Sequence, residues 1–533
     1  MLQISSADHT VSPPVVEFPP TYNAAYDLIQ RNILAGRGDK TAFIDDQGQY
    51  SYSELDRRSA QVANALNSLG IQREQRVMVC LHDTIDFPAV FLGAIKAGII
   101  PVATNTLLAE KDYEYMLRDS RARIAIVSEP LLGTFAPLLE RVPTLEKIIV
   151  SGKADSETDS LAALVKGQSE QFDVVPTVAD DACFWLYSSG STGSPKGTVH
   201  VHSSMVNTAE LYARPILSIN ENDVVFSAAK LFFAYGLGNG LSFPMSVGAT
   251  TVLMAERPTP DSVSKRLIDH QPSIFYGVPT LYAAMLASDS LPTPDQVNIR
   301  LCTSAGEALP EELSKRWYEH FSVDIYDGIG STEMLHIYLS NRPGDIRYGT
   351  TGRAVPGYEL KIIDDQGDIV EQANEPGELQ VCGPTAANGY WNNRLKTRST
   401  FLGEWTRSGD KYYRDEEGYY VYAGRSDDML KVSGIYVSPI EVESTLMSHE
   451  AVLEVAVIAK EDPDQLIKPA AYVVLKNGYE GGEEMSAALK QHVKNHLAPY
   501  KYPRWFKFVD ELPKTATGKI QRFKLRELEQ KDQ

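Results

Sequence analysis

The sequence has few cysteines and no arrangement of them that suggests a metal site. Its 533 residues contain only Cys80, Cys183, Cys302 and Cys382, which are widely spaced and form no CxxC pair. Such spacing supports neither a zinc site nor a disulfide framework. We therefore expect four small, buried thiols in a reducing compartment.

The sequence also lacks long apolar runs and an excess of positive charge. No stretch reaches about 18 uninterrupted apolar residues, the length that a membrane helix needs. The first residues include Asp8, Glu17 and four prolines, which is unlike a signal peptide. A net charge of −19 disfavours nucleic acid and anionic membranes as partners. These features predict a cytoplasmic protein, and they leave open the binding of one nucleotide in a local basic pocket.

The length of the chain exceeds what one hydrophobic core usually serves, so two or more domains are expected. From about residue 21 to 423, short apolar runs alternate with helical periods. Residues 76–81 and 98–102 are typical of strands, and residues 87–96 of a helix. This alternation predicts layered α/β structure with largely parallel sheets. The first ~20 residues are predicted to form a loose, proline-rich surface arm.

The charge distribution changes near the end of the chain. Residues 428–533 carry a net charge of −1, so the preceding part carries −18. The polar, charged segment 424–434 lies at this change and is typical of a linker or hinge. We therefore expect a small, locally basic domain to follow a large acidic one.

Residues 187–197, Tyr-Ser-Ser-Gly-Ser-Thr-Gly-Ser-Pro-Lys-Gly, are the most informative stretch. They follow an apolar, strand-like segment at 182–186. Glycine lets backbone N–H groups approach phosphate oxygens, hydroxyls add donors, and Lys196 adds a charge. The stretch is not a Walker A loop, because Pro195 precedes the lysine and Gly197 follows it. A flexible surface linker is the alternative on composition alone.

Three further segments combine glycine with groups that could contact a nucleotide. Residues 326–333, Tyr-Asp-Gly-Ile-Gly-Ser-Thr-Glu, place a carboxylate near glycine backbone that a ligand can approach closely. The alternative for this segment is an ordinary turn with a solvated glutamate. Asp410 follows Gly409 and could accept hydrogen bonds from ribose hydroxyls. Lys519 lies in the loop-like stretch 515–520, where there is little other charge.

Taken together and in this order, these motifs resemble the adenylate-forming superfamily, which includes acyl-CoA synthetases, peptide-synthetase adenylation domains and luciferases. The resemblance extends over about residues 22–526. It implies an α/β fold, with a large N-terminal domain of layered sheets and helices and a small, mobile α+β C-terminal domain. The implied domains are residues 1–427, which bind ATP and the acid, and residues 428–533, which carry the catalytic lysine. Asp427 occupies the hinge position of the family.

The resemblance also implies roles for individual residues around ATP and Mg²⁺. Thr332 matches the residue that binds the α-phosphate, Glu333 matches the Mg²⁺ ligand, and Thr192 is a second metal-binding candidate. The β- and γ-phosphates are assigned to Ser188, Ser189, Gly190, Ser191, Thr192, Gly193 and Lys196. Adenine is assigned to Gly306, Glu307, Ala308, Tyr326 and Asp327, and ribose to Asp410 and Arg425.

Lys519 resembles the family's catalytic lysine of the first half-reaction. A carboxylate and ATP are both anionic, so a cation that bridges them neutralises charge as the adenylate forms. In the family, the small domain then rotates about the hinge and admits the pantetheine thiol of coenzyme A. Lys431, Ser433 and Gly434 are expected near that thiol.

The residues expected to surround the acyl group indicate its charge and shape. The segment 230–238 lacks the aspartate with which peptide synthetases hold an ammonium group, which favours an acyl-CoA ligase for an acid with an uncharged acyl tail. The expected acyl wall comprises Ala228, Phe233, Ala234, Tyr235, Ala305, Gly328, Ile329, Gly330 and His336. Rings among small residues suit a flat, compact acid, although Phe233 and Tyr235 alone are equally typical of ordinary core residues.

Residues 331–341 and 347–353 most closely resemble bacterial benzoate–CoA ligases and their 4-hydroxybenzoate relatives. The resemblance implies an acid–thiol ligase that forms benzoyl-adenylate and then benzoyl-CoA, with ATP, Mg²⁺ and coenzyme A. The alternatives are a ligase for 4-hydroxybenzoate or another substituted aryl acid, luciferase-like oxidation as a minor one, and a binding protein that does not turn over. The oligomeric state stays open, with a homodimer among the options.

Overall fold

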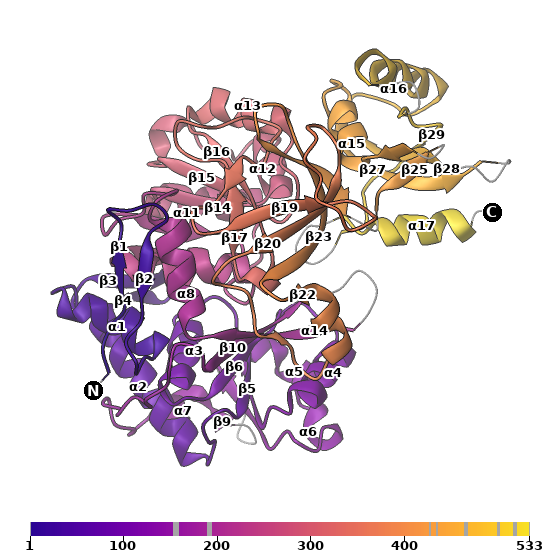
Figure 1. The fold of residues 1–533 in the computed structure, drawn as a ribbon. Helices are drawn as coiled ribbons and strands as arrows, with labels where there is room; N and C mark the ends of the chain where they lie inside the picture. The colour runs from indigo at the N-terminus through magenta and orange to yellow at the C-terminus, as the bar shows by residue number, and fades with distance from the viewer. Residues whose placement is uncertain are drawn as a thin grey trace.

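The computed structural model describes residues 2–152, 159–188, 194–425, 428–432, 435–462, 467–497, 501–514 and 520–531. Figure 1 shows these residues as layers of sheets and helices, with the C-terminal elements gathered at one end of the molecule. Among the described residues, no helix is long and apolar enough to cross a membrane. The predicted α/β class is confirmed.

The first large sheet has eight strands in the order β21-β11-β10-β6-β5-β7-β8-β9. Its central strands are parallel and buried on both faces, which explains their nearly continuous apolar sequence. Strand β11 joins them antiparallel to β10. In chain order the strands are β5 Arg76–Cys80, β6 Ile100–Ala103, β7 Ile124–Ser128, β8 Lys147–Ser151, β9 Asp159–Ser160, β10 Ala182–Ser188, β11 Lys196–Val201 and β21 Gly389–Tyr390.

The second large sheet has nine strands in the order β18-β17-β16-β15-β14-β12-β13-β3-β4. Its six central strands run parallel, and the outer strands pair antiparallel. In chain order they are β3 Thr41–Asp45, β4 Gly48–Ser51, β12 Val224–Ser227, β13 Thr250–Val252, β14 Ile274–Gly277, β15 Leu301–Ser304, β16 Ile325–Gly330, β17 Ile337–Ser340 and β18 Arg353–Ala354.

Helices pack between and around the two sheets and close the main core. Helix α3 lies very close to α2: a Cβ on Gly93 would be 2.7 Å from the carbonyl oxygen of Ser59. The longer helices are α1 Ala24–Leu34, α2 Tyr52–Ser68, α3 Asp86–Lys96, α4 Glu110–Ser120, α11 Pro260–His270, α12 Pro279–Leu286 and α13 Glu311–Phe321. The shorter ones are α5 Leu132–Phe135, α6 Leu138–Arg141, α7 Leu161–Val165, α8 Ser203–Thr208, α9 Ala234–Leu237, α10 Phe243–Val247 and α14 Arg394–Thr400.

Two short segments are π-helical, η2 at Ala209–Ala213 and η3 at Gly238–Ser242. Single π-helical turns are rare and occur often beside functional sites. Three 3₁₀ turns complete the helical elements, at Glu129–Leu131 (η1), Pro294–Gln296 (η4) and Thr332–Met334 (η5).

A third sheet, within residues 359–425, departs from the largely parallel pairing that was expected and that the two large sheets show. Its five strands are all antiparallel. Residues 415–419 connect β23 to β24, and so short a connection cannot join parallel neighbours. The strands are β19 Glu359–Ile363, β20 Gly377–Cys382, β22 Phe401–Leu402, β23 Trp405–Arg414 and β24 Tyr420–Arg425.

The C-terminal residues form α+β structure, as expected. A hairpin of β25 and β26 precedes a three-stranded sheet, β27-β28-β29, that packs with three helices. The elements are β25 Leu430–Val432, β26 Ile435–Val437, α15 Pro439–Met447, β27 Val452–Glu461, β28 Ile467–Leu475, α16 Glu483–His496, β29 Trp505–Phe508 and α17 Arg522–Lys531. The boundary between domains at residue 427 stays a prediction.

The N-terminal arm is more ordered than its prolines suggest. Residues Ser6–Asp8 (β1) and Val15–Glu17 (β2) form an antiparallel pair, and side chains of the arm bond to buried groups of the large domain. The prediction of a loose arm is therefore wrong, because polar anchors replace the apolar contacts that the segment lacks. Three of the four cysteines are buried as expected, while Cys382 is partly exposed.

Candidate active site

The carboxyl ends of four parallel strands, β12, β14, β15 and β16, meet at one edge of the nine-stranded sheet. Register places Ser227 beside Tyr276, and Ser304 beside both Gly277 and Asp327. This edge is where open α/β sheets bind ligands. It brings together Ala228, Ala305, Gly306 and the stretch 326–330, which the sequence assigned to the acid and the adenine.

His336 immediately precedes β17 and is only 2% exposed. Its Nε2 is 3.2 Å from the carbonyl oxygen of Tyr235 and 3.2 Å from Oδ1 of Asn239. A carbonyl oxygen only accepts, so Nε2 carries the proton and donates. Burial lowers the pKa of His336 to about 3, which keeps the ring neutral. Nδ1 has no hydrogen-bond partner among the described residues.

Two glycines leave space for His336, Gly238 for its imidazole ring and Gly330 for its backbone. A Cβ on Gly238 would lie 2.3 Å from Cδ2 of His336, and a Cβ on Gly330 would lie 2.5 Å from its carbonyl oxygen. Both distances are shorter than any real Cβ contact, so neither position has room for a side chain. Gly330 was predicted to line the acyl wall.

Two aromatic residues of the expected acyl wall lie at the start of α9. Phe233 immediately precedes the helix, and Tyr235 lies in its first turn. The phenol oxygen of Tyr235 is 2.6 Å from Oγ1 of Thr303, and burial raises its pKa far above the ordinary value. The Phe233 ring packs against Phe232 at 4.4 Å between centroids. Both side chains are only half-buried, and both pack on core residues. Their role in binding the acid stays a prediction.

The other end of the candidate site surrounds the carboxylate of Glu333. Ser188 and Lys196 face each other across the β10–β11 pair. The Ser188 hydroxyl donates to Oε1 of Glu333 at 3.2 Å. Burial lowers the pKa of Lys196, an effect that the nearby Glu333 carboxylate opposes. Three residues assigned to phosphate and Mg²⁺ thus lie together.

Tyr390 joins this cluster and was not predicted from the sequence. Its hydroxyl donates to Oε1 of Glu333 at 2.8 Å, and Nζ of Lys196 lies 4.8 Å from the centroid of its ring. Strand β21 brings it there by pairing with β11, with Tyr390 opposite Thr198. No local pattern around residue 390 marks it, because the contact depends on this long-range pairing.

Backbone hydrogen bonds hold the segment that carries Thr332 and Glu333. Ser331 caps the short 3₁₀ turn through its side chain. Nε2 of His200 lies 2.8 Å from the carbonyl oxygen of Thr332, and burial lowers the pKa of this histidine to about 4. The amide of Ala387 donates to the carbonyl oxygen of Glu333. Both candidate side chains remain partly exposed.

The assigned ribose pair is also brought together. Asp410 and Arg425 lie opposite each other on β23 and β24, with Nη1 of the arginine 3.3 Å from Oδ1 of the aspartate. The charge of Arg425 also lowers the pKa of Lys196, so the assigned ribose pair lies near the lysine assigned to phosphate.

In the assigned adenine segment, burial raises the pKa of Asp327 well above its usual value. Its Oδ1 has no hydrogen-bond partner among the described residues.

A Mg²⁺ ion on a nucleotide needs only one or two carboxylates, because phosphates and water supply the remaining ligands. Glu333 fits that requirement. The described residues contain no group of three or more His, Cys, Asp or Glu side chains that could hold a metal alone.

Several predicted residues lie outside the described residues, so their roles stay predictions. They are Ser189, Gly190, Ser191, Thr192, Gly193, Asp427, Ser433, Gly434 and Lys519. Lys431 lies in β25, but its side chain is not described. Glu307 and Ala308 lie partly exposed after β15, beside Gly306, whose φ is +92°.

Comparison with known protein families decides the family. Residues 30–391 match the AMP-binding enzyme family, and residues 441–519 match the AMP-binding enzyme C-terminal domain. The chain belongs to the AMP-binding enzyme family. The resemblance to adenylate-forming proteins is thereby confirmed.

Relatives within the AMP-binding enzyme family match almost the whole chain. A benzoate–CoA ligase of Thauera aromatica is 65% identical over 99% of this chain and 100% of its own length. A 4-hydroxybenzoate–CoA/benzoate–CoA ligase of Rhodopseudomonas palustris is 51% identical, over 95% of this chain and 94% of its own. The crystal structure of a benzoate CoA ligase from Burkholderia xenovorans LB400 is 54% identical and superposes with a TM-score of 0.89, over 95% of this chain and 99% of that one.

Proposed function

We propose that this enzyme activates benzoate with ATP, releases pyrophosphate, and transfers the benzoyl group to coenzyme A to give benzoyl-CoA and AMP. The observation that carries the proposal is the neutral character of the acyl wall. The pKa of buried His336 is lowered and that of Tyr235 is raised, so both rings are uncharged. The remaining residues assigned to the wall are apolar. A wall without charge does not suit a charged acyl tail, and the rings of Phe233, Tyr235 and His336 suit a flat aromatic group.

Lys230, which lies between Ala228 and Phe233 in the chain, is already engaged. Nζ of Lys230 donates to the carbonyl oxygens of Met254 and Glu256. It is therefore held away from the role of a counter-ion for a charged acyl tail. The identity to a benzoate–CoA ligase over the full length supports the same acid.

In the first half-reaction, an oxygen of the benzoate carboxylate attacks the α-phosphorus of ATP, and pyrophosphate leaves. We assign Thr332 to the α-phosphate, and Ser188 and Lys196 to the leaving phosphates. Mg²⁺ held through Glu333 would neutralise the charge on the leaving group. Lys519 bridges the carboxylate and the α-phosphate and stabilises the charge that develops between them.

In the second half-reaction, the thiol sulfur of coenzyme A attacks the carbonyl carbon of benzoyl-adenylate, and AMP leaves. We propose that residues 428–533 turn about Asp427 between the two steps. This motion withdraws Lys519 and brings Lys431, Ser433 and Gly434 to the thiol. Because the reaction consumes ATP and coenzyme A, we expect it to occur in the cytoplasm. A homodimer stays a prediction.

The 4-hydroxy acid is the second candidate substrate. A phenol hydroxyl needs a hydrogen-bond partner inside a pocket, and Nδ1 of His336 is a buried acceptor without one. The relative from Rhodopseudomonas palustris carries both acids in its name. Benzoate makes no use of that acceptor.

The test is to identify all products with the purified protein. Benzoate, ATP, Mg²⁺ and coenzyme A should give benzoyl-CoA, AMP and pyrophosphate in equal amounts, measured by mass spectrometry and phosphate release. Without coenzyme A, benzoate should still exchange labelled pyrophosphate into ATP. ADP as the nucleotide product would exclude the adenylate route. Nucleotide binding without any acid-dependent turnover would favour the binding-protein alternative.

A further inference from the structure

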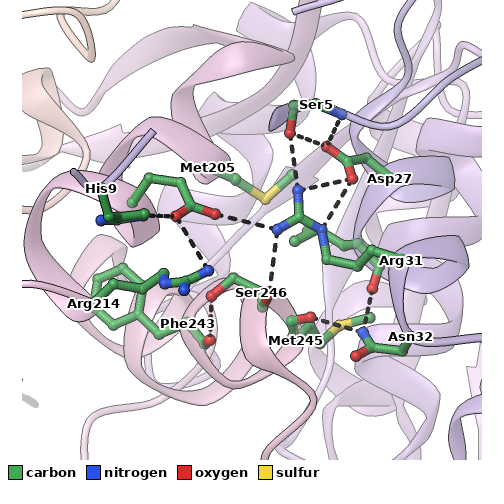
Figure 2. Close-up of polar contacts among 12 residues, drawn as sticks. Ser5, His9, Asp27, Arg31, Asn32, Met205, Arg214, Phe243, Met245 and Ser246 are labelled. Atoms are coloured by element: carbon green, nitrogen blue, oxygen red, sulfur yellow. Dashed lines mark hydrogen bonds and ion pairs between the residues drawn. The ribbon is translucent and has the colours of Figure 1, made fainter. Parts of the chain in front are cut away.

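Side chains of the N-terminal arm take part in a buried ionic network of the large domain (Figure 2). Nε2 of His9 lies 2.7 Å from Oε2 of Glu210, a side chain that is 3% exposed. Both the amide and the hydroxyl of Ser5 donate to Oδ2 of Asp27, which is fully buried. Residues more than 200 positions apart in the chain are thus joined at this point.

Arg31 lies at the centre of these contacts. Its Nε and Nη2 donate to Oδ1 of Asp27, at 3.0 and 2.8 Å, and Nη2 donates to Ser5. Its Nη1 donates to Oε1 of Glu210 at 3.2 Å and to the carbonyl oxygen of Ser246 at 3.2 Å. We call Ser5, His9, Asp27, Arg31, Glu210 and Ser246 the Arg31 network.

The two elements that this network holds are those behind His336. Glu210 belongs to the π-helix η2, and the ring of Tyr212 on the same π-helix is 5.6 Å from the His336 ring. Ser246 belongs to α10, and the ring of Phe243 at the start of α10 packs edge-on against His336 at 4.5 Å. Glu210 is thus two residues from Tyr212, and Ser246 is three residues from Phe243; both of these rings contact the imidazole.

A second bond ties α10 to the same helix of the large domain. The side-chain amide of Asn32, next to Arg31 on α1, donates to the carbonyl oxygen of Met245 at 2.7 Å. Consecutive residues of α1 therefore hold consecutive carbonyl groups of α10 (Figure 2). The backbone that carries Phe243 is fixed in position by these side chains.

We propose that Glu210 and Arg31 are positioning residues for the acid, and that the N-terminal arm, through His9 and Ser5, helps to set the shape of the acyl wall. This inference rests on the proposed function, since it assigns the His336 wall to the acid. Removal of one partner from a buried ionic network leaves an uncompensated charge, and the elements around it rearrange. The rings behind His336 then shift, although none of the altered residues contacts the acid.

The test compares Glu210→Gln, His9→Ala and His9→Gln with wild type, using benzoate as the probe. A misplacement of about 1 Å can cost up to ~100-fold, so we expect Glu210→Gln to raise the KM for benzoate about tenfold. His9 lies at the edge of the network, and His9→Ala should raise this KM about threefold. The glutamine variant of His9 keeps an N–H donor to Glu210 and should restore most of the wild-type value. The KM for ATP should stay within about twofold in all three.

Asp56→Asn is the matched control, because it removes the partner of another buried cation. Oδ1 of Asp56 is 2.5 Å from Nζ of Lys96, which is 3% exposed. The two residues belong to α2 and α3, which carry none of the residues assigned to the wall. This variant should lower the melting temperature and leave the KM for benzoate unchanged.

Three outcomes would overturn the inference. One is a wild-type KM for benzoate in both Glu210→Gln and His9→Ala. Another is an equal rise in the KM values for benzoate and ATP, and the third is a rise in Asp56→Asn as large as that in Glu210→Gln. If Glu210→Gln does not fold, the pair of exposed His9 variants decides the question. A wild-type protein without benzoate-dependent pyrophosphate release would instead contradict the proposed function.

Discussion

The hydroxyl of Tyr390 donates to Oε1 of Glu333 at 2.8 Å, and Ser188 donates to the same oxygen at 3.2 Å. One carboxylate oxygen is thus oriented by two neutral donors. We propose that the second oxygen binds Mg²⁺ and that Tyr390 acts on the site by orienting Glu333.

Tyr390→Phe should slow the first half-reaction without abolishing it. A hydrogen bond to a charged group contributes about 1.5–3 kcal/mol, which corresponds to roughly a 10- to 100-fold lower rate if all of it is lost in the transition state. The measurement is benzoate-dependent exchange of pyrophosphate into ATP across a range of Mg²⁺ concentrations, and high Mg²⁺ should recover part of the loss.

Tyr348→Phe is the matched control for this prediction. Its hydroxyl donates to Asp324 at 2.6 Å, and Asp324 precedes β16 at the end opposite the site. This variant should exchange pyrophosphate as wild type does. An unchanged rate in Tyr390→Phe as well would show that the orientation of Glu333 does not matter.

Lys519→Ala should block adenylate formation far more than thioester formation. Loss of a group that stabilises transition-state charge typically costs about 3 kcal/mol or more. Synthetic benzoyl-adenylate supplied with coenzyme A should restore much of the rate of thioester formation. Lys514→Ala is the control, because its ammonium group pairs with Glu454 at 2.6 Å. An equal fall in both half-reactions of Lys519→Ala would contradict the assigned role.

Asp427→Pro should spare adenylation and disable thioester formation. Proline fixes its own φ and restricts the preceding residue, whereas a hinge must change φ and ψ between two states. Pyrophosphate exchange in the presence of benzoate should continue. Asp427→Gly keeps the backbone free and should retain both half-reactions. Normal turnover of coenzyme A by the proline variant would place the pivot elsewhere.

The neutral state of His336 should make the protein less stable in acid. Its folded pKa of about 3 is below the ordinary 6.5, so between these values the unfolded chain binds more protons. The free energy of unfolding should therefore fall as the pH drops from about 6.5 towards 3, by up to ~1.4 kcal/mol per pH unit for this group. Above pH 6.5 this contribution should be complete and constant.

His336→Gln removes that titration and provides the comparison. Urea unfolding between pH 7 and pH 4.5 should show a shallower loss of stability in the variant than in wild type. His200 and His202, whose pKa values are also lowered by burial to about 4, act in the same direction in both proteins. Parallel curves for the two proteins would mean that His336 is not held neutral.

Local patterns in the sequence predicted the elements whose residues are close together in the chain. Strands β5 and β10 and helix α3 follow from continuous apolar runs and helical periodicity, and Ser188, Lys196 and Glu333 follow from motifs. The contacts of Tyr390 with Glu333 and of Arg31 with Glu210 join residues 57 and 179 positions apart. These contacts depend on strand pairing and helix packing, which a local sequence pattern does not reveal.

The antiparallel sheet at residues 359–425 was missed for a related reason. Strands such as Gly377–Cys382 and Trp405–Arg414 contain half-buried or exposed side chains as well as buried ones, and they include charged residues. A sheet with one partly solvated face is typical of antiparallel strands, but these strands show neither a strict alternation nor the continuous apolar runs that precede them. The N-terminal arm was predicted to be loose because its contacts with the large domain are made by single polar side chains, Ser5 and His9, which form no recognisable sequence pattern.

Specificity constants for a set of acids test the central claim most directly. We would measure kcat/KM for benzoate, 4-hydroxybenzoate, hexanoate and decanoate with wild type, Phe233→Ala and His336→Ala. Overfilling a tight site costs about 1–3 kcal/mol, so benzoate should exceed decanoate by roughly 10- to 100-fold in wild type, and both variants should narrow that gap. A higher value for 4-hydroxybenzoate would favour the second candidate substrate, with His336 as the partner of its hydroxyl. Decanoate equal to or better than benzoate in wild type would contradict an aromatic acid as the substrate.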